Sequence, residues 1–215
     1  MDTIRALLAI TPIYGLKIQQ MDIKGAYLNG ILKECIYMRQ PEGFEDETGR
    51  VCQLIKTLYG LKQSGREWNN QFNEKLTNFG FRHLRSDPCV YIKHENNGFI
   101  IVAVWVDDLL LFASWDRIVT ETKSFLQSEW EVTDLGEPNK MVGIEITQNS
   151  ESITISQRGY IESILRRENL HEMHGTQSPM DPNIKFERNP DDNECNCSNS
   201  FARLLGEVQY IANST

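Results

Sequence analysis

Two adjacent aspartates, Asp107 and Asp108, stand in the middle of the apolar run IIVAVWVDDLLLFAS, which covers residues 100–114. Burying an ionised carboxylate costs several kcal/mol unless a partner compensates its charge, and two neighbouring carboxylates also repel each other. One solution is a turn that lifts both side chains out of the core. The other is a cation held between them.

A turn alone does not account for both aspartates, because two-residue hairpin turns usually contain Asn-Gly or Asp-Gly and Val-Asp-Asp-Leu has no glycine. Mg²⁺ binds carboxylate oxygens together with substrate phosphates. Asp22 is the candidate third carboxylate, since it lies near the end of an expected strand and would sit beside the hairpin tip in one sheet. Carboxylates of this kind hold two metal ions about 3.5–4 Å apart, one activating an attacking hydroxyl and one stabilising the leaving oxygens.

Short strands and amphipathic helices would position these aspartates. The predicted strands cover residues 17–24, 35–40, 51–55, two strands within 89–106 joined across Asn97-Gly98, 109–113, 141–146 and 153–155. The predicted helices are one ending at residue 10, one that carries Trp68, Phe72, Leu76 and Phe79 inward and stops at Gly80, and those at 116–129, 158–169 and 200–212. The fold class is therefore α+β, with an antiparallel sheet and helices on one face.

Composition narrows the class of protein. The 215 residues, 40% of them hydrophobic, suffice for one large or two small domains. A net charge of −8 argues at first sight against a nucleic-acid partner, but residues 101–215 hold most of the acidity, with 9 basic and 19 acidic side chains. Five cysteines without CxxC spacing predict reduced thiols and no zinc site. We expect no targeting signal. We also expect no membrane partner, because the apolar run at 99–113 is too short and too acidic at its centre to span a membrane.

Four stretches, in order along the chain, resemble motifs of the reverse transcriptase domain of copia-type retrotransposons. They are QMDIKGAYLNGILKECIYMRQPEGF from Gln20, LYGLKQSGREW from Leu58, WVDD from Trp105 and MVGIEI from Met141. The segments ISQRGYIESIL, SPM and FARLLGEVQYIANST follow in the order of that family. The resemblance covers almost the whole chain, and it implies a polymerase palm-like antiparallel sheet with partial fingers and a partial thumb or connection region.

The resemblance implies RNA-directed DNA synthesis, in which a primer 3′-hydroxyl attacks the α-phosphate of a deoxynucleoside triphosphate (dNTP) with the help of two Mg²⁺ ions, or Mn²⁺. The residues it implies are Asp22, Asp107 and Asp108 for catalysis and metal binding, Tyr27, Lys62, Gln63 and Arg66 for substrate binding, and Met141, Val142 and Gly143 for the primer grip. Tyr27, five residues after Asp22, would clash with a ribose 2′-hydroxyl and so select deoxynucleotides. The alternatives are an ordinary packed tyrosine, and exposed cations without a ligand at Lys62 and Arg66.

Four positions depart from the pattern of the family, and one of them is Gly25, which replaces a commoner small polar or bulkier residue. Trp105 replaces the usual tyrosine before Val-Asp-Asp, which keeps an aromatic ring but changes its contact with the primer. Gly65 replaces the usual proline and loosens the backbone where a helix starts. Thr133 stands where the family commonly has a lysine, and the resemblance implies that this lysine donates a proton to the leaving pyrophosphate. A general acid is therefore missing.

The resemblance also predicts an organisation along the chain. We expect the palm with partial fingers at 1–147, the start of the thumb or connection at 148–170, a loop or linker at 171–200, and at 201–215 a C-terminal helix that leads toward an absent ribonuclease H domain. We expect the upstream fingers and the ribonuclease H domain to belong to other segments of a Pol polyprotein, and the chain alone to be inactive.

The implied partners are an RNA or DNA template with its primer, dNTP, and those other Pol segments. The implied location is the cytoplasm, within a virus-like particle, or the nucleus. Two alternatives stay open. One is a catalytically inactive palm remnant that binds nucleic acid weakly at most. The other is a nucleotide cyclase with a similar palm, which would need neither LYGLKQ nor the primer-grip stretch.

Overall fold

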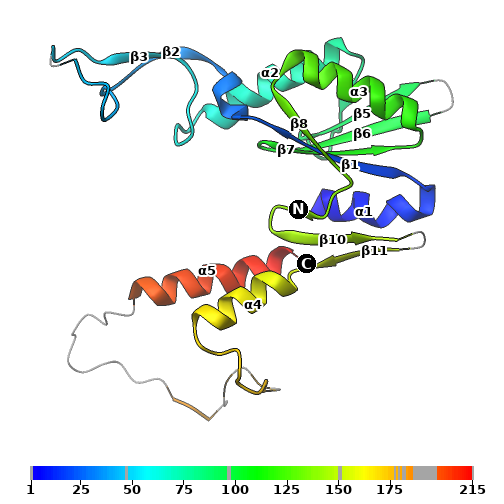
Figure 1. The fold of residues 1–215 in the computed structure, drawn as a ribbon, viewed down its shortest axis with the longest axis vertical. Coiled ribbons are helices and arrows are strands. Elements are labelled where there is room, and N and C mark those ends of the chain that lie inside the picture. The colour runs from blue at the N-terminus through cyan, green and yellow to red at the C-terminus, as the bar shows by residue number, and fades with distance from the viewer. Residues whose placement is uncertain are drawn as a thin grey trace. The chain divides into compact units, whose positions relative to one another are not determined.

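The computed structural model describes residues 2–46, 48–95, 98–149, 152–176, 178, 180, 183–185 and 198–214. Asn97 of the expected hairpin, two of the five cysteines and most of the expected linker lie outside the described residues. The chain divides into two compact units, the first made of residues 1–139 and 148–153 and the second of 140–147 and 154–215. Both mix helices with antiparallel strands, so the α+β class is confirmed (Figure 1).

The first unit is built on a six-stranded antiparallel sheet in the order β4-β5-β6-β7-β1-β8. Its strands are β1 (Lys17–Ile23), β4 (Arg82–His83), β5 (Val90–Glu95), β6 (Gly98–Trp105), β7 (Asp108–Ala113) and β8 (Val132–Gly136). Its helices are α1 (Asp2–Tyr14), the 3-10 turn η1 (Ala26–Asn29), α2 (Ser64–Asn78) and α3 (Asp116–Glu129). A separate two-stranded sheet joins β2 (Ile31–Met38) to β3 (Cys52–Lys56).

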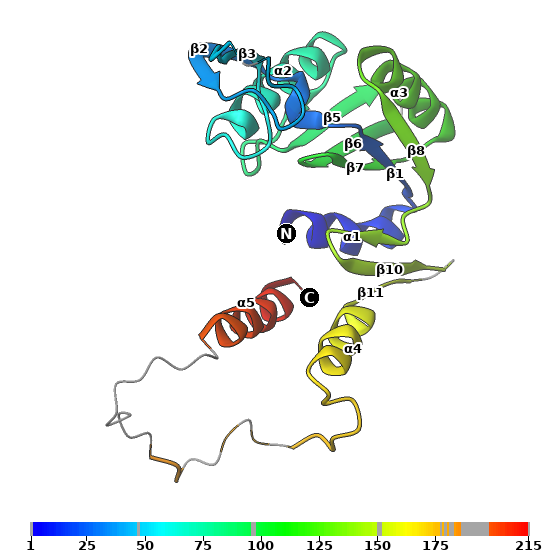
Figure 2. The same cartoon turned by 60° about the vertical axis from the view of Figure 1, so that its left-hand side comes forward.

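The core of this unit forms because the central strands are apolar on both faces. Every residue of β7 from Leu109 to Ala113 is fully buried. On one face, α2 contributes Trp68, Phe72 and Leu76 to the hydrophobic core cluster at helical spacing, and α3 contributes further aliphatic side chains. Figures 1 and 2 both show α2 and α3 on one side of the sheet and α1 on the other. The prediction that the helices lie on one face of the sheet is therefore right for α2 and α3 and wrong for α1.

The second unit contains β9 (Lys140–Met141), most of β10 (Ile144–Gln148) and β11 (Ile153–Ser156), and the helices α4 (Arg158–Arg167) and α5 (Ser198–Ser214). The three strands form one sheet in the order β11-β10-β9. Arg203 of α5 pairs with Glu168 after α4 at 2.8 Å, and the ring of Tyr160 meets the ring of Tyr210 edge-on at 5.3 Å. These contacts bring together two helices that are far apart in sequence.

Local sequence signals failed at several places; the short strand β4, for example, was not expected. The strand expected over 141–146 is broken into β9 and β10, because Val142 and Gly143 adopt left-handed conformations and form a turn. Helix α1 continues past residue 10 and includes Pro12, since burial of its apolar face outweighs the cost of the proline. Strand β8 was not expected, because its side chains are mostly exposed and carry no alternating pattern. In the described part of the chain, no helix is long and apolar enough to cross a membrane.

Candidate active site

The acidic pair lies at the turn between β6 and β7, as the sequence predicted. Trp105 pairs with Asp108 across the hairpin, so Val106 and Asp107 form a two-residue turn. Val106 has φ +56°, which a two-residue hairpin turn favours but a β-branched side chain strongly disfavours. Trp68 donates from its indole Nε1 to the Val106 carbonyl at 3.0 Å, and Ile23 donates its backbone N–H to the Asp107 carbonyl at 2.8 Å. Core packing thus holds a strained turn in place.

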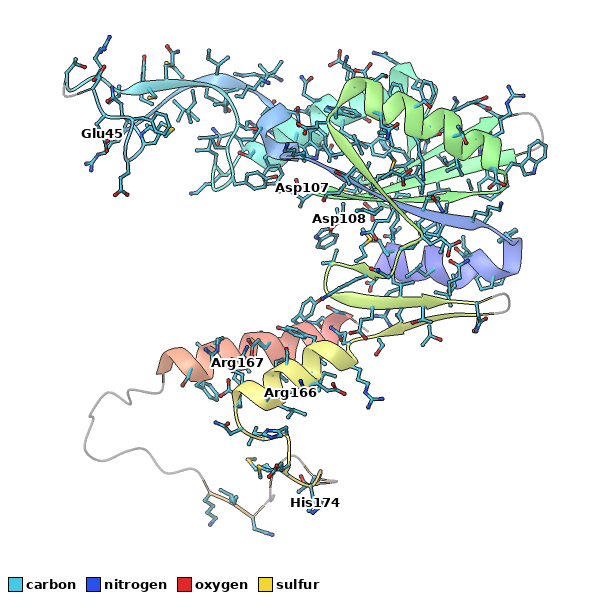
Figure 3. The ribbon with its side chains drawn as sticks, viewed as in Figure 1. Glu45, Asp107, Asp108, Arg166, Arg167 and His174 are labelled. Atoms are coloured by element: carbon cyan, nitrogen blue, oxygen red, sulfur yellow. The ribbon has the colours of Figure 1, made fainter. Side chains whose placement is uncertain are left out.

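The third aspartate lies beside this turn. In the antiparallel pairing of β1 with β7, Asp22 stands directly opposite Asp108. Directly opposed residues project from the same face, with Cβ atoms about 4.5–5.5 Å apart. The predicted placement of Asp22 beside the hairpin tip is therefore confirmed. Figure 3 labels Asp107 and Asp108 at the end of the hairpin.

Asp107 is already engaged by two donors. The hydroxyl of Tyr59 lies 2.8 Å from both carboxylate oxygens of Asp107, and the backbone N–H of Ala26 donates to its Oδ1 at 3.2 Å. Partial desolvation of the phenol, together with the hydrogen bond to Asp107 and the negative charge of Asp107, raises the pKa of Tyr59 to about 12. The phenol therefore remains a hydrogen-bond donor at neutral pH.

The surroundings of Asp108 make ionisation of its carboxyl less favourable. Its partial burial raises the pKa of its carboxyl above the ordinary value, a hydrogen bond from Gln20 Nε2 at 3.3 Å lowers it, and the charges of Asp22 and Asp107 raise it again. The carboxylates thus repel one another, and no cationic side chain among the described residues pairs with them. A bound divalent ion would remove that repulsion.

The chemistry of these groups fits a hard cation, because three carboxylates offer the oxygen ligands that Mg²⁺ and Mn²⁺ prefer. As the side chains lie, however, no three His, Cys, Asp or Glu groups within the described ranges stand together as a metal site. Asp107 is turned toward Tyr59 and Ala26, whereas Asp22 and Asp108 face each other. Metal binding would thus require Asp107 to reorient.

Tyr27 lies next to the acidic turn. It follows Ala26, the residue that donates to Asp107, and its ring packs against the ring of Tyr59 with centroids 4.8 Å apart. Thr57 donates its hydroxyl to the Tyr27 carbonyl, which fixes the backbone of η1. Tyr27 also lines a cavity of about 220 Å³ together with Gly65 and Trp68. Tyr27 therefore adjoins two residues that contact Asp107, namely Ala26 and Tyr59.

The other predicted substrate residues differ in their surroundings. Lys62 is exposed and forms no ion pair within the part of the chain that the structure describes. Gln63 precedes α2, and its side chain makes no capping hydrogen bond. Arg66 is engaged, with Nε 2.9 Å from Glu67 and Nη2 3.0 Å from Glu34. A phosphate would have to compete with two carboxylates for Arg66, and all three roles stay predictions.

Met141, Val142 and Gly143 belong to the second unit and lie at the β9–β10 junction. Val142 has φ +48° and Gly143 has φ +81°. The hydroxyl of Tyr210, on α5, donates to the Val142 carbonyl. A role for these residues at a primer is not tested by the fold, but the turn is anchored by a side chain that is far away in sequence.

The structure adds residues that sequence reasoning missed. Tyr59 and Gln20 contact the aspartates, and Trp68, assigned to the core, also holds the turn. For these contacts, the one signal in the sequence was that Tyr59 lies within LYGLKQ, a stretch that resembles a motif of the family. Of the departures from the family pattern, Thr133 is exposed on β8 directly opposite Asp22. The site of the missing lysine is therefore adjacent to a candidate metal ligand.

Comparisons with known proteins identify the family of the chain. Residues 1–182 match the family model described as reverse transcriptase (RNA-dependent DNA polymerase). The chain is 35% identical over 193 residues to the retrovirus-related Pol polyprotein from transposon TNT 1-94 of Nicotiana tabacum, which covers 87% of this chain and 14% of that protein.

Two further relatives show the same pattern. The chain is 30% identical to the Pol polyprotein from transposon RE1 of Arabidopsis thaliana, over 98% of this chain and 14% of that protein. It is 34% identical to a putative transposon Ty5-1 protein of Saccharomyces cerevisiae, over 74% of this chain and 53% of that protein. The chain thus spans a small part of the Pol polyproteins that it matches. No solved structure matches it.

Proposed function

Because the chain belongs to the reverse transcriptase family found in copia-type transposon Pol polyproteins, we propose that it carries the catalytic aspartates of an RNA-directed DNA polymerase. One observation carries the proposal. Asp22 stands opposite Asp108 at the end of paired strands, and Asp107 forms the adjoining turn. A structural role alone does not explain three carboxylates at one strained turn beside a packed core.

The proposed reaction is transfer of a deoxynucleotide to a primer 3′-hydroxyl. Two Mg²⁺ ions, when bound by Asp22, Asp107 and Asp108, would activate that hydroxyl and neutralise charge on the phosphates. The chain contributes mainly positioning, since the paired strands and the buried indole of Trp68 fix where the carboxylates stand. Thr133 lies opposite Asp22, and its hydroxyl does not release a proton to the leaving group as a lysine ammonium would.

Substrate selection would fall to side chains around the acidic turn. Tyr27 is proposed to exclude a ribose 2′-hydroxyl, which its closeness to the Asp107 donor Ala26 supports. Lys62 and Gln63 are proposed to contact template or nucleotide, and Arg66 would do so only by exchanging its carboxylate partners. Met141, Val142 and Gly143 are proposed to contact the primer. The proposed partners are a primed RNA or DNA template, dNTP and other segments of the polyprotein.

The test is primer extension on a homopolymer template with a labelled dNTP and Mg²⁺, by the chain joined to the upstream fingers segment of its polyprotein, because the chain alone is expected to be inactive. The proposal expects metal-dependent addition of at least one nucleotide that disappears in Asp107→Asn. Asp116→Asn is the matched control, because Asp116 is an exposed aspartate paired with Lys17 outside the site. Extension that survives Asp107→Asn would contradict the proposal.

An inactive palm that binds nucleic acid weakly is the second candidate, and two observations favour it. Thr133 replaces the lysine of the family, and Tyr59 occupies the carboxylate of Asp107. This candidate expects primer–template binding without extension. If only the general acid is missing, Thr133→Lys restores extension by about 10²-fold or more, since proton transfer typically contributes 10²–10⁴-fold. No gain in Thr133→Lys would favour the inactive palm.

A further inference from the structure

The carboxylate of Asp107 is occupied by a side chain that belongs to neither strand of the hairpin. Tyr59 lies 2.8 Å from both of its oxygens, and it comes from the turn that precedes α2. Asp22 and Asp108, the other two carboxylates, face each other. Within the described residues no three such groups stand together as a metal site, and Asp107 is the one of the three carboxylates that Tyr59 and the backbone N–H of Ala26 hold.

We infer that Tyr59 is a latch on the metal site, and that its hydroxyl must leave Asp107 before a divalent cation can use that carboxylate. The inference rests on the metal site of the proposed function. The phenol hydroxyl lies at the same distance from both carboxylate oxygens, where a cation bound by both oxygens would lie, so metal and hydroxyl compete for the same position. Tyr59 is a positioning residue in this scheme, because it acts through Asp107.

The surroundings of Tyr59 suit a group that moves. Its side chain is 50% exposed, so it leaves Asp107 without opening the core. Gly60 follows it with φ +96°, at the end of a turn closed by the Leu61 N–H on the Leu58 carbonyl. Ser64 at the start of α2 also donates to the Leu58 carbonyl, so the base of the turn stays fixed while the tyrosine side chain rotates.

Release of Tyr59 from Asp107 would also affect Tyr27, whose ring is proposed to contact the sugar. Tyr59 packs against Tyr27 with ring centroids 4.8 Å apart, so movement of one ring removes a neighbour of the other. Tyr27 has space to follow, because it lines the cavity of about 220 Å³ beside Gly65 and Trp68. Occupation of the metal site and the shape of the sugar pocket are therefore coupled through Tyr59.

The experiment measures Mn²⁺ binding to the intact 215-residue chain by calorimetry and by the loss of the free-ion paramagnetic resonance signal. Tyr59→Phe removes the hydroxyl and keeps the ring. We expect it to bind Mn²⁺ about threefold to tenfold more tightly than the wild type, the equivalent of one typical net hydrogen bond. Tyr14→Phe is the matched control, since Tyr14 is exposed and has no hydrogen bond within the described residues.

A second background isolates the contact itself. In Asp107→Asn, the Tyr59→Phe change should leave Mn²⁺ affinity unaltered, because the carboxylate that the latch holds is gone. Circular dichroism and the unfolding midpoint of each variant report whether it is folded. A folded Tyr59→Phe variant with tighter binding that depends on Asp107 supports the latch.

The outcomes separate the latch from the proposed function. If Asp107→Asn weakens Mn²⁺ binding while Tyr59→Phe binds as the wild type does, the metal site stands and the latch is wrong. If neither the wild type nor Tyr59→Phe binds Mn²⁺, or if binding ignores Asp107→Asn, the metal site is wrong and the latch falls with it. If Tyr59→Phe binds Mn²⁺ and the wild type does not, the latch is stronger than expected.

Discussion

Two turns, one in each unit, share an unusual construction. Val106 between β6 and β7 and Val142 between β9 and β10 both adopt left-handed conformations, with φ of +56° and +48°. In each case the strained carbonyl accepts a hydrogen bond from an aromatic side chain on a helix distant in sequence. Trp68 of α2 holds Val106, and Tyr210 of α5 holds Val142.

The two turns differ in how they are supported. The first lies between long buried strands, and Ile23 and Ala26 add hydrogen bonds to Asp107. The second follows a two-residue strand and continues into Gly143, whose φ of +81° is natural only for glycine. Strain of this kind persists where the surroundings over-determine the conformation. The turn with the carboxylates has more such support than the turn that resembles a primer grip.

The largest expected effect comes from removing the support of the first turn. Trp68→Phe deletes the indole donor to Val106 and leaves space in the buried core, so it should lower the free energy of unfolding by about 2–3 kcal/mol. Urea denaturation measures the change. Trp115→Phe, at an exposed tryptophan, should change it by less than about 0.5 kcal/mol. Equal effects of the two would show that the first turn does not depend on Trp68.

The second turn should be sensitive to a methyl group at Gly143. A Cβ there would lie 2.6 Å from the Tyr210 hydroxyl, in addition to the cost of the left-handed conformation, so Gly143→Ala should destabilise by about 2–3 kcal/mol. Gly43→Ala is the matched control, because Gly43 has φ +82° and no atom within 4 Å of its added Cβ. It should cost about 1 kcal/mol.

Removing the hydroxyl that holds the second turn should have a smaller effect. Tyr210→Phe loses one hydrogen bond to Val142, and about 1 kcal/mol of local stability with it. Hydrogen exchange of the β9–β10 amides measures this local opening. The same change should also relieve the clash in Gly143→Ala, so the double variant should be more stable than the sum of the single effects predicts. Strict additivity would mean that the two groups do not meet.

The smallest expected effect tests the strain itself. Val142→Asn replaces a β-branched residue by one that tolerates the left-handed region, and should raise stability by about 0.5 kcal/mol. The measurement is again urea denaturation, with Val132→Asn on β8 as a control in an ordinary strand conformation, where a loss is expected. A loss at Val142 as large as at Val132 would argue against strain at the second turn.

Sequence predicted the parts of the fold that depend on local pattern. The apolar run around Asp107 and Asp108 gave the hairpin, and the spacing of Trp68, Phe72 and Leu76 gave the inner face of α2. Pattern failed where contacts between distant residues decide. Val142 and Gly143 form a turn within a run that alternates like a strand, and this turn depends on Tyr210, 68 positions away.

The candidate site was predicted unevenly for the same reason. A strand end and an acidic turn sufficed to place Asp22 beside Asp108. The contact of Tyr59 with Asp107 was not foreseen, because no local periodicity encodes a hydrogen bond between residues 48 positions apart. Likewise, one of the two ion pairs that engage Arg66 of α2 depends on Glu34 of β2. The roles proposed for these side chains at a substrate stay predictions.

Trp68 has a consequence for how a gene of this kind would decay. Its ring belongs to the buried core, and its nitrogen holds the turn that carries Asp107. We therefore expect a mutation that loosens the core near Trp68 to disturb the acidic turn as well. In a transposon copy that is no longer under selection, the polymerase activity proposed above would then be lost while the protein still folds, and a folded product would be no sign of a living element.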